Sequence, residues 1–199
     1  MQRHHPWQQW NYPNTTDKAN SMINCMMDLE TWGTRPGCAI RSIGAVMFDP
    51  KNDKLGSTFY ETVLDASCKE AGLHTDPGTA KWWSEQSQEA RDALVAGTQL
   101  TLIEVAEKFD AWWKQNRAIY VWSQGGNFDE PIWSVAMHSV GRKVPWRYYD
   151  TRCTRTIYSL ARLNPKTIKR EGTHHNALED AKYQAKCVQA SYARLNNDK

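Results

Sequence analysis

Residues 22–31 read MINCMMDLET, an apolar run that predicts a strand over about 22–29 and ends on the carboxylates of Asp28 and Glu30. Side chains on a strand alternate between its two faces, so residues at i and i+2 share one side. We therefore expect both carboxylates to point the same way, which is a geometry suited to a divalent metal ion. The pair alone is weak evidence, because acids after a strand are usually a helix cap or part of a solvated loop.

The rest of the chain supplies the elements of an α/β layered domain. Apolar patterning predicts further strands over 40–48, 57–64, 118–122 and 146–149. It predicts helices over 77–95, 101–116, a stretch after Gly125-Gly126, 151–163 and 176–195. Pro131 suits the first turn of the third helix, where its missing N–H costs nothing. The order βββαβαβα indicates a mixed five-stranded sheet flanked by helices.

A second polar segment lies near the C-terminus, where residues 174–180 read HHNALED. His175 and Asp180 are five residues apart, an offset of about 140° within one helix, so their side chains would diverge there. We therefore expect His175 in the loop just ahead of the helix that contains Asp180. His174 is the alternative site histidine if the register differs by one residue. Glu179, the acid next to Asp180, is predicted to point away from the site.

Asp129 follows the predicted strand 118–122, just before Pro131. Taken alone, it is best interpreted as the N-cap of the next helix, although a cap can also serve a site. An acid-x-acid pair, an Asp after a second strand and a His ahead of a helical Asp form a combination that is far rarer by chance than any one of them.

These residues resemble the signature of the DEDDh exonucleases, the RNase H-like 3'-5' exonucleases that are defined by four acids and a histidine. Asp28 and Glu30 match the first motif, Asp129 the second, and His175 with Asp180 the third. Three segments are similar to the branch that contains the phage single-strand DNA exonuclease A and the mycobacterial exoribonuclease-like domain: DLETWGT at 28–34, SIGAV at 42–46 and KWWSEQS at 81–87. The similarity runs from about Met22 to Lys186.

The resemblance implies a two-metal hydrolase. Hard carboxylate oxygens favour Mg²⁺ or Mn²⁺, and two such ions about 4 Å apart would clamp an in-line displacement at phosphorus. Asp28, Glu30 and Asp180 would hold the first ion, and Asp28 with Asp129 the second. His175, whose unperturbed pKa is near 6.5, would be the general base for the attacking water, and a nucleoside 5'-monophosphate would leave.

Several neighbours are candidates for substrate binding. By resemblance, Leu29 and Thr31 would contact the 3'-terminal nucleotide, with Asn127 and Phe128 as second-tier candidates. At least one of Trp82 and Trp83 is a core residue of an amphipathic helix. The other could stack on a terminal base, and we favour Trp83 for this role.

Charge and cysteine content narrow the function further. The net charge is +3, but residues 141–170 contain nine Lys and Arg and only one acid, Asp150. This local excess of positive charge suits binding of a nucleic-acid phosphate backbone, and it is also typical of an ordinary basic surface. The five cysteines are scattered without a C-x-x-C pair, so we expect neither a zinc site nor a disulfide framework. With neither a membrane-length apolar run nor a signal sequence, we expect a soluble protein of the cytoplasm.

We divide the chain into an N-terminal arm, 1–21, and an exonuclease domain, 22–199. Trp7, Trp10 and Tyr12 of the arm could grip a neighbouring subunit, stack on bases or lie on the domain surface. The predicted function is a 3'-5' exonuclease of single-stranded nucleic acid, with DNA slightly favoured over RNA. Three further hypotheses are an exoribonuclease with the same chemistry, a non-catalytic nucleic-acid-binding module and a proofreading subunit of a polymerase. Relatives often dimerise, which makes a homodimer a further expectation.

Overall fold

The computed structural model describes residues 22–95 and 97–197. The five strands of its single sheet are β1 (Asn24–Thr31), β2 (Ile40–Phe48), β3 (Leu55–Thr62), β4 (Tyr120–Ser123) and β5 (Thr151–Cys153). The longer helices are α2 (Pro77–Ser84), α4 (Leu102–Gln115), α5 (Asp129–Ser139), α6 (Thr154–Leu160) and α7 (Ala177–Asn197). The short ones are α1 (Asp65–Glu70), α3 (Gln88–Ala93) and the 3-10 turns Tyr148–Asp150 and Pro165–Thr167.

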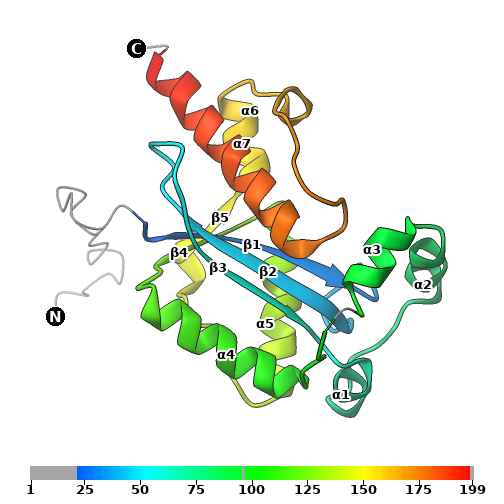
Figure 1. Cartoon of the computed structure of the whole chain (residues 1–199). Coiled ribbons are helices and arrows are strands. Elements are labelled where there is room, and N and C mark those ends of the chain that lie inside the picture. Colours follow the sequence, from blue (N-terminus) through cyan, green and yellow to red (C-terminus); the bar gives the residue numbers. More distant parts are fainter. Residues whose placement is uncertain (1–21, 96, 198–199) are drawn as a thin grey trace, which may run out of the picture.

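The sheet has the order β3-β2-β1-β4-β5. β1, β2 and β3 form the antiparallel meander, whereas β4 runs parallel to β1 and β5 parallel to β4. Helices α4 and α5 cover one face and α6 and α7 cover the other, as Figure 1 shows. The predicted mixed five-stranded sheet flanked by helices is therefore confirmed.

The alternation along β1 divides the core into two clusters. Cys25, Met27 and Leu29 pack in the cluster that also holds residues of α4 and α5, whereas Met26 packs with residues of α7. Asp28 and Glu30 follow Met26 at intervals of two residues and therefore lie on the same face of β1, so both carboxylates are on the α7 side of the sheet. The expected common orientation of these two acids follows directly from this packing.

Gly44 of β2 lets α7 approach the sheet closely. It lies opposite Asp28 in the β1–β2 register. A Cβ atom at this position would lie 2.1 Å from the backbone nitrogen of Leu178 and 2.2 Å from the carbonyl carbon of Ala177. Real Cβ contacts are not this short, so only glycine allows the first turn of α7 to rest on β2. The helix that contains Asp180 thereby begins beside the strand pair that contains Asp28.

The expected helix over 77–95 is wrong as one element, because the chain forms α2 and α3 with a break between them. Asp76 caps α2 through the backbone N–H groups of Gly78 and Thr79, and Ser87 caps α3 through that of Ala90. Ser87 starts a new helix because its hydroxyl oxygen accepts the hydrogen bond of the Ala90 N–H. In one continuous helix that N–H would instead bond to the backbone carbonyl four residues earlier.

The last strand and the helix after it begin a few residues later than the sequence pattern predicts. Residues 146–149 contain no strand: Trp146 packs in the α4–α5 cluster and Tyr148 is 80% exposed. The edge strand is β5, which pairs with β4 through Val121 and Thr151. The helix predicted over 151–163 is correspondingly shorter, at Thr154–Leu160.

The expected arm, 1–21, lies outside the described residues. Among the residues that are described, none belongs to a helix that is both long enough and apolar enough to cross a membrane.

Candidate active site

Three separate parts of the chain bring the five predicted site residues together. Asp28 and Glu30 come from β1, Asp129 is the first residue of α5, and Asp180 is in the first turn of α7. Ligand atoms of Glu30, Asp180 and His175 lie within 4.8 Å of one another. The side chain of Asp129 reaches the same strand, where its Oδ1 accepts a hydrogen bond from Leu29 N at 3.2 Å.

His175 lies in the turn before α7, as expected, and has a left-handed backbone with φ of 60°. Asn176 separates it from the helix and caps α7, accepting hydrogen bonds from the backbone nitrogens of Leu178 and Glu179. His174 is exposed and is not part of the Glu30–Asp180 group, so the geometry selects His175 over its neighbour.

Side-chain contacts decide the roles of Glu179 and Asp129. Glu179 forms an ion pair with Lys182 at 2.8 Å, so its carboxylate is engaged outside the acid cluster. Asp129 is not the N-cap that its position suggested: Phe128 occupies the cap position, and the carboxylate of Asp129 bonds across to β1 instead.

The carboxylates of Asp28, Glu30 and Asp129 lie close together and are largely shielded from water, so their negative charges repel one another. Burial is the main reason that the pKa of Glu30 rises to about 8 and that of Asp129 to about 7. The pKa of Asp28 is also raised well above its usual value, first by desolvation and then by the charges of Asp129 and Glu30. This cluster cannot hold its full negative charge near pH 7 without added positive charge, so its chemistry fits a bound divalent metal ion.

Positively charged and polar side chains already surround the cluster. Arg170 forms an ion pair with Asp180, and its guanidinium lies 4.8 Å from the ring centroid of Tyr183. Gln184 donates a 2.6 Å hydrogen bond to Asp28 Oδ1, and the charge of Arg41 lowers the pKa of Glu30.

Sequence patterns did not identify Arg170, Gln184 or Arg41 as members of the site. Only Gln184 had a local signal, because it follows Asp180 by one helical turn and therefore lies on the same face of α7.

The surroundings of His175 favour its neutral imidazole. Burial, the neighbouring His174 and the charge of Arg170 all lower the pKa of His175, in that order of size. The ring is therefore neutral at pH 7. Trp82 contacts it edge to face, with ring centroids 4.9 Å apart and planes at 88°.

A pocket of about 400 Å³ adjoins the acids. The predicted substrate-binding residues Leu29, Thr31, Trp83 and Phe128 line it together with Glu30, Trp82 and several small residues. Asn127 is exposed and does not belong to this lining.

The two tryptophans of this pocket have different environments. Trp83 is only 3% exposed, and its Nε1 donates a 2.9 Å hydrogen bond to the carbonyl oxygen of Thr31. Trp82 is 41% exposed. Of the two rings, Trp82 has the free surface that a stacked base would need, whereas Trp83 holds the end of β1.

Comparison with known proteins adds an independent line of evidence. Residues 23–192 match the family model of the 3'-5' exoribonuclease Rv2179c-like domain. The exodeoxyribonuclease of Enterobacteria phage T4 is 28% identical over 128 residues, which cover 56% of this chain and 54% of the phage protein. The chain thus spans about half the length of that curated relative.

Solved structures share the fold. The nuclease domain of 3'hExo, a DEDDh family member bound to rAMP, matches with a TM-score of 0.59 at 14% identity, over 90% of this chain and 95% of that one. The zinc-bound form of E. coli ExoI in complex with ssDNA matches with a TM-score of 0.60 at 15% identity, over 88% of this chain and 42% of that one. The family model covers most of the described residues, so this chain belongs to the Rv2179c-like 3'-5' exoribonuclease domain family, and it shares the fold of the DEDDh family member 3'hExo.

Proposed function

We propose that this chain is a 3'-5' exonuclease that removes nucleoside 5'-monophosphates from single-stranded nucleic acid. The observation that supports this most directly is the convergence of four acids and a neutral histidine beside an aromatic pocket. The basic bias of residues 141–170 supports a polyanionic substrate.

Two divalent metal ions, Mg²⁺ or Mn²⁺, are the proposed cofactors. Asp28, Glu30 and Asp180 would hold one ion, and Asp28 with Asp129 the other. When bound, such ions supply positive charge that orients the phosphate and stabilises the charge that develops on its oxygens. The raised pKa values of Glu30 and Asp129, and the pairing of Asp180 with the cation of Arg170, support this assignment.

His175 is the proposed general base. Its imidazole is neutral at pH 7 and lies within the acid group, so a ring nitrogen can accept the proton of the water that attacks phosphorus. The edge contact with Trp82 restricts the orientation of the ring, and the cap provided by Asn176 fixes the start of α7 next to it. In this role His175 needs no metal bond of its own.

The 3'-terminal nucleoside is proposed to occupy the pocket of about 400 Å³. Leu29, Thr31 and Phe128 would contact its sugar and base, with Asn127 at the exposed margin. We assign the stacking role to Trp82, because its ring is accessible, and we assign Trp83 the role of holding Thr31 in place.

RNA and DNA are both candidates for the substrate. The family model that matches residues 23–192 describes an exoribonuclease, and the phage relative is an exodeoxyribonuclease that aligns over a shorter stretch. Because the exoribonuclease match is the broader one, we place RNA first and DNA second, which reverses the slight preference for DNA drawn from the sequence alone.

The decisive experiment follows 5'-labelled single-stranded RNA and DNA oligonucleotides with Mg²⁺, Mn²⁺ or EDTA. The test variant is Asp180→Asn, and Glu179→Gln is a matched control because it alters the adjacent acid on the same helix outside the cluster. Metal-dependent shortening from the 3' end should fall at least about 100-fold in Asp180→Asn, since even outer partners of metal ligands matter by 10- to 100-fold. Tight binding by the wild type without shortening would instead indicate a non-catalytic binding module.

A further inference from the structure

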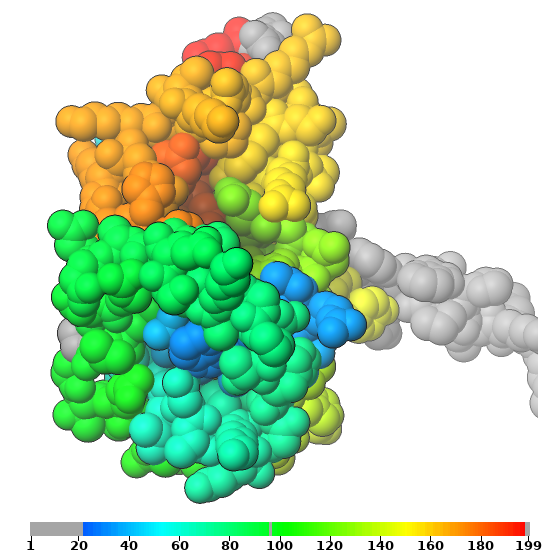
Figure 2. Space-filling view, turned by 90° about the vertical axis from the view of Figure 1, so that its right-hand side faces the viewer, coloured from blue at the N-terminus to red at the C-terminus, as the bar shows by residue number. Residues whose placement is uncertain are grey.

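A second hollow of about 690 Å³ adjoins the acid cluster through Arg170, the ion-pair partner of Asp180. Figure 2 faces it: the hollow lies between the yellow segment around residue 155 and the orange segment around residue 170, with α7 at its floor. Arg170 lines this groove and also pairs with Asp180. The groove therefore connects directly to the proposed metal ligands.

The lining of the groove is cationic. Arg155, Lys166, Lys169 and Arg170 contribute to it, His174 stands at its edge, and none of the described residues that line it is a carboxylate. By contrast, the pocket of about 400 Å³ beside the acids is lined mainly by aromatic, aliphatic and small residues, with Glu30 as the one charged group that the described residues contribute. The two cavities thus differ in the chemistry that they can recognise.

Three of the four Lys and Arg residues of the groove have no ion-pair partner among the described residues. Throughout residues 22–95 and 97–197, Arg155, Lys166 and Lys169 form no ion pair, and all three are exposed. The acid of the same loop, Glu171, is bound to Lys186 at 2.6 Å. The charges of Arg155 and Lys169 act on Asp129 and Glu171 in the direction that lowers their pKa, but no described carboxylate forms an ion pair with any of these three cations. They can therefore still bind an external anion.

A nucleic acid strand has two kinds of surface that match the two cavities. Its bases are flat and stack on aromatic rings, whereas its backbone repeats a negative charge at each phosphate. With the terminal base beside Trp82 and the scissile phosphate at the acids, the next phosphates must leave the cluster away from the aromatic pocket. The cationic groove shares no lining residue with that pocket and is joined to the acids by Arg170.

We propose that this groove binds the phosphate backbone of the substrate strand on the 5' side of the scissile bond, with Lys166 and Lys169 as contacts that set affinity without reading sequence. The inference rests on the proposed exonuclease function. It predicts that affinity grows with strand length beyond the terminal nucleotide, independently of base identity, and that this gain depends on salt because phosphate contacts release condensed counterions.

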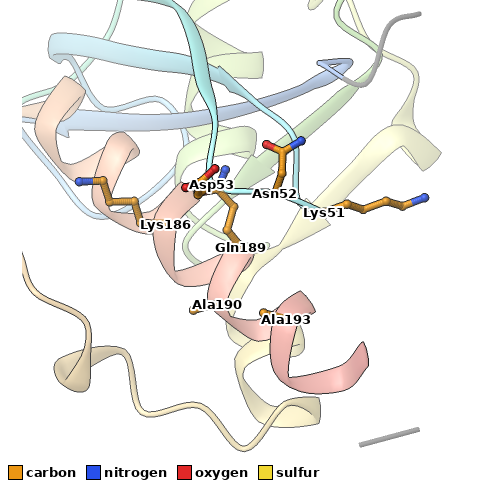
Figure 3. Close-up of a pocket in the computed structure, with 7 residues that line it drawn as sticks. All are labelled: Lys51, Asn52, Asp53, Lys186, Gln189, Ala190 and Ala193. Atoms are coloured by element: carbon orange, nitrogen blue, oxygen red, sulfur yellow. The ribbon is translucent and has the colours of Figure 1, made fainter. Parts of the chain in front are cut away.

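A third hollow, between the β2–β3 turn and α7, is a useful comparison. In the close-up of Figure 3, the ammonium groups of Lys51 and Lys186 point outward in different directions, and Lys186 is the residue already bound to Glu171. These lysines do not converge on a common anion. Lys51 and the nearby exposed Lys54 therefore provide a control that changes the same charge elsewhere on the surface.

The test compares Lys166→Gln/Lys169→Gln with the control Lys51→Gln/Lys54→Gln, both in an Asp28→Asn background that blocks cleavage. Dissociation constants are measured for 12-nucleotide thymidine and uridine strands and for the corresponding dinucleotides, between 50 and 300 mM KCl. Loss of two phosphate contacts should weaken 12-mer binding about tenfold and lower the slope of log affinity against log salt by about 1.4, at roughly 0.7 per phosphate for single strands. The advantage of the 12-mer over the dinucleotide should shrink by the same factor, and the control should match the parent.

Cleavage is measured in parallel on the same variants with Asp28 intact, so that the two proposals can fail separately. An unchanged salt slope and 12-mer affinity in the groove variant would refute strand binding in this groove, even if the wild type degrades the strands. A reduced slope and affinity without any cleavage by the wild type would support the groove as a backbone site and refute the exonuclease activity.

Discussion

Gly44→Ala tests whether the close contact between α7 and β2 positions the active site. The new Cβ would lie 2.1 Å from Leu178 N and 2.5 Å from the carbonyl oxygen of Ala177, and these are backbone atoms that cannot rotate away. Ordinary contacts need about 3.4 Å or more, so the start of α7 must shift by about 1 Å or β2 must deform. Overpacking of this kind costs about 1–3 kcal/mol, which corresponds to roughly 2–12 °C in melting temperature for a domain of this size.

The same shift should damage catalysis more than it damages stability. Asp180 and His175 flank the clash, and a misplacement of about 1 Å at a catalytic centre can reduce the rate about 100-fold. The assay combines thermal unfolding with 3'-end shortening of a labelled oligonucleotide, measured well below the melting temperature.

Gly126→Ala is the control, because its new Cβ would meet only Cys153 Cβ at an ordinary 4.0 Å. Wild-type rate and melting temperature in Gly44→Ala would refute the idea that this glycine sets the position of α7.

Three other predictions follow from the site. Without metal, the free energy of unfolding should fall as pH rises from about 4.5 to 8. The folded-state pKa values of Glu30 and Asp129 are raised to about 8 and about 7, so the fold stabilises their protonated forms and loses that stability as they ionise. Thermal melts in EDTA test this, and Mg²⁺ should raise the melting temperature more at pH 8 than at pH 5.5. Trp82→Ala should raise KM about 5- to 150-fold through loss of roughly 1–3 kcal/mol of base stacking, whereas Trp83→Phe should mainly lower the melting temperature. Steady-state kinetics and thermal melts that gave the reverse pattern would contradict the assignment. His175→Gln should lower kcat by about 10²- to 10⁴-fold and leave the Mn²⁺-induced rise in melting temperature intact, so loss of that rise would show that His175 binds metal instead.

The basic segment illustrates how a one-dimensional charge pattern becomes a surface. Residues 141–170 contain nine cations, but the fold distributes them among different environments. Arg147 pairs with Asp150 and Arg142 lies near Glu107 and Asp110, whereas Lys166 and Lys169 remain without ion-pair partners among the described residues along the groove. The Arg147–Asp150 pair is local, but Arg142 meets acids of α4 that are distant in sequence, so only the folded chain shows which cations have ion-pair partners.

Local periodicity predicted the central strands and the common orientation of Asp28 and Glu30, whereas Asp129 joined the predicted cluster only through the family resemblance. The period of two on a strand directs Asp28 and Glu30 to one side, and the five-residue offset places His175 ahead of the helix rather than in it. Both inferences depend on backbone geometry within a few residues, which is why they needed no knowledge of the tertiary fold.

Tertiary structure decided what surrounds those acids. The packing of α2 against the end of β1 buries Trp83 and leaves Trp82 accessible, and the contact of Gln184 with Asp28 joins residues 156 positions apart. Such contacts depend on how α7 packs against β2, and the energy of that packing comes from burial across the whole sheet rather than from any local segment. The sequence by itself therefore determined which residues form the acid cluster, and only the tertiary structure determined which cations, aromatic rings and grooves face them.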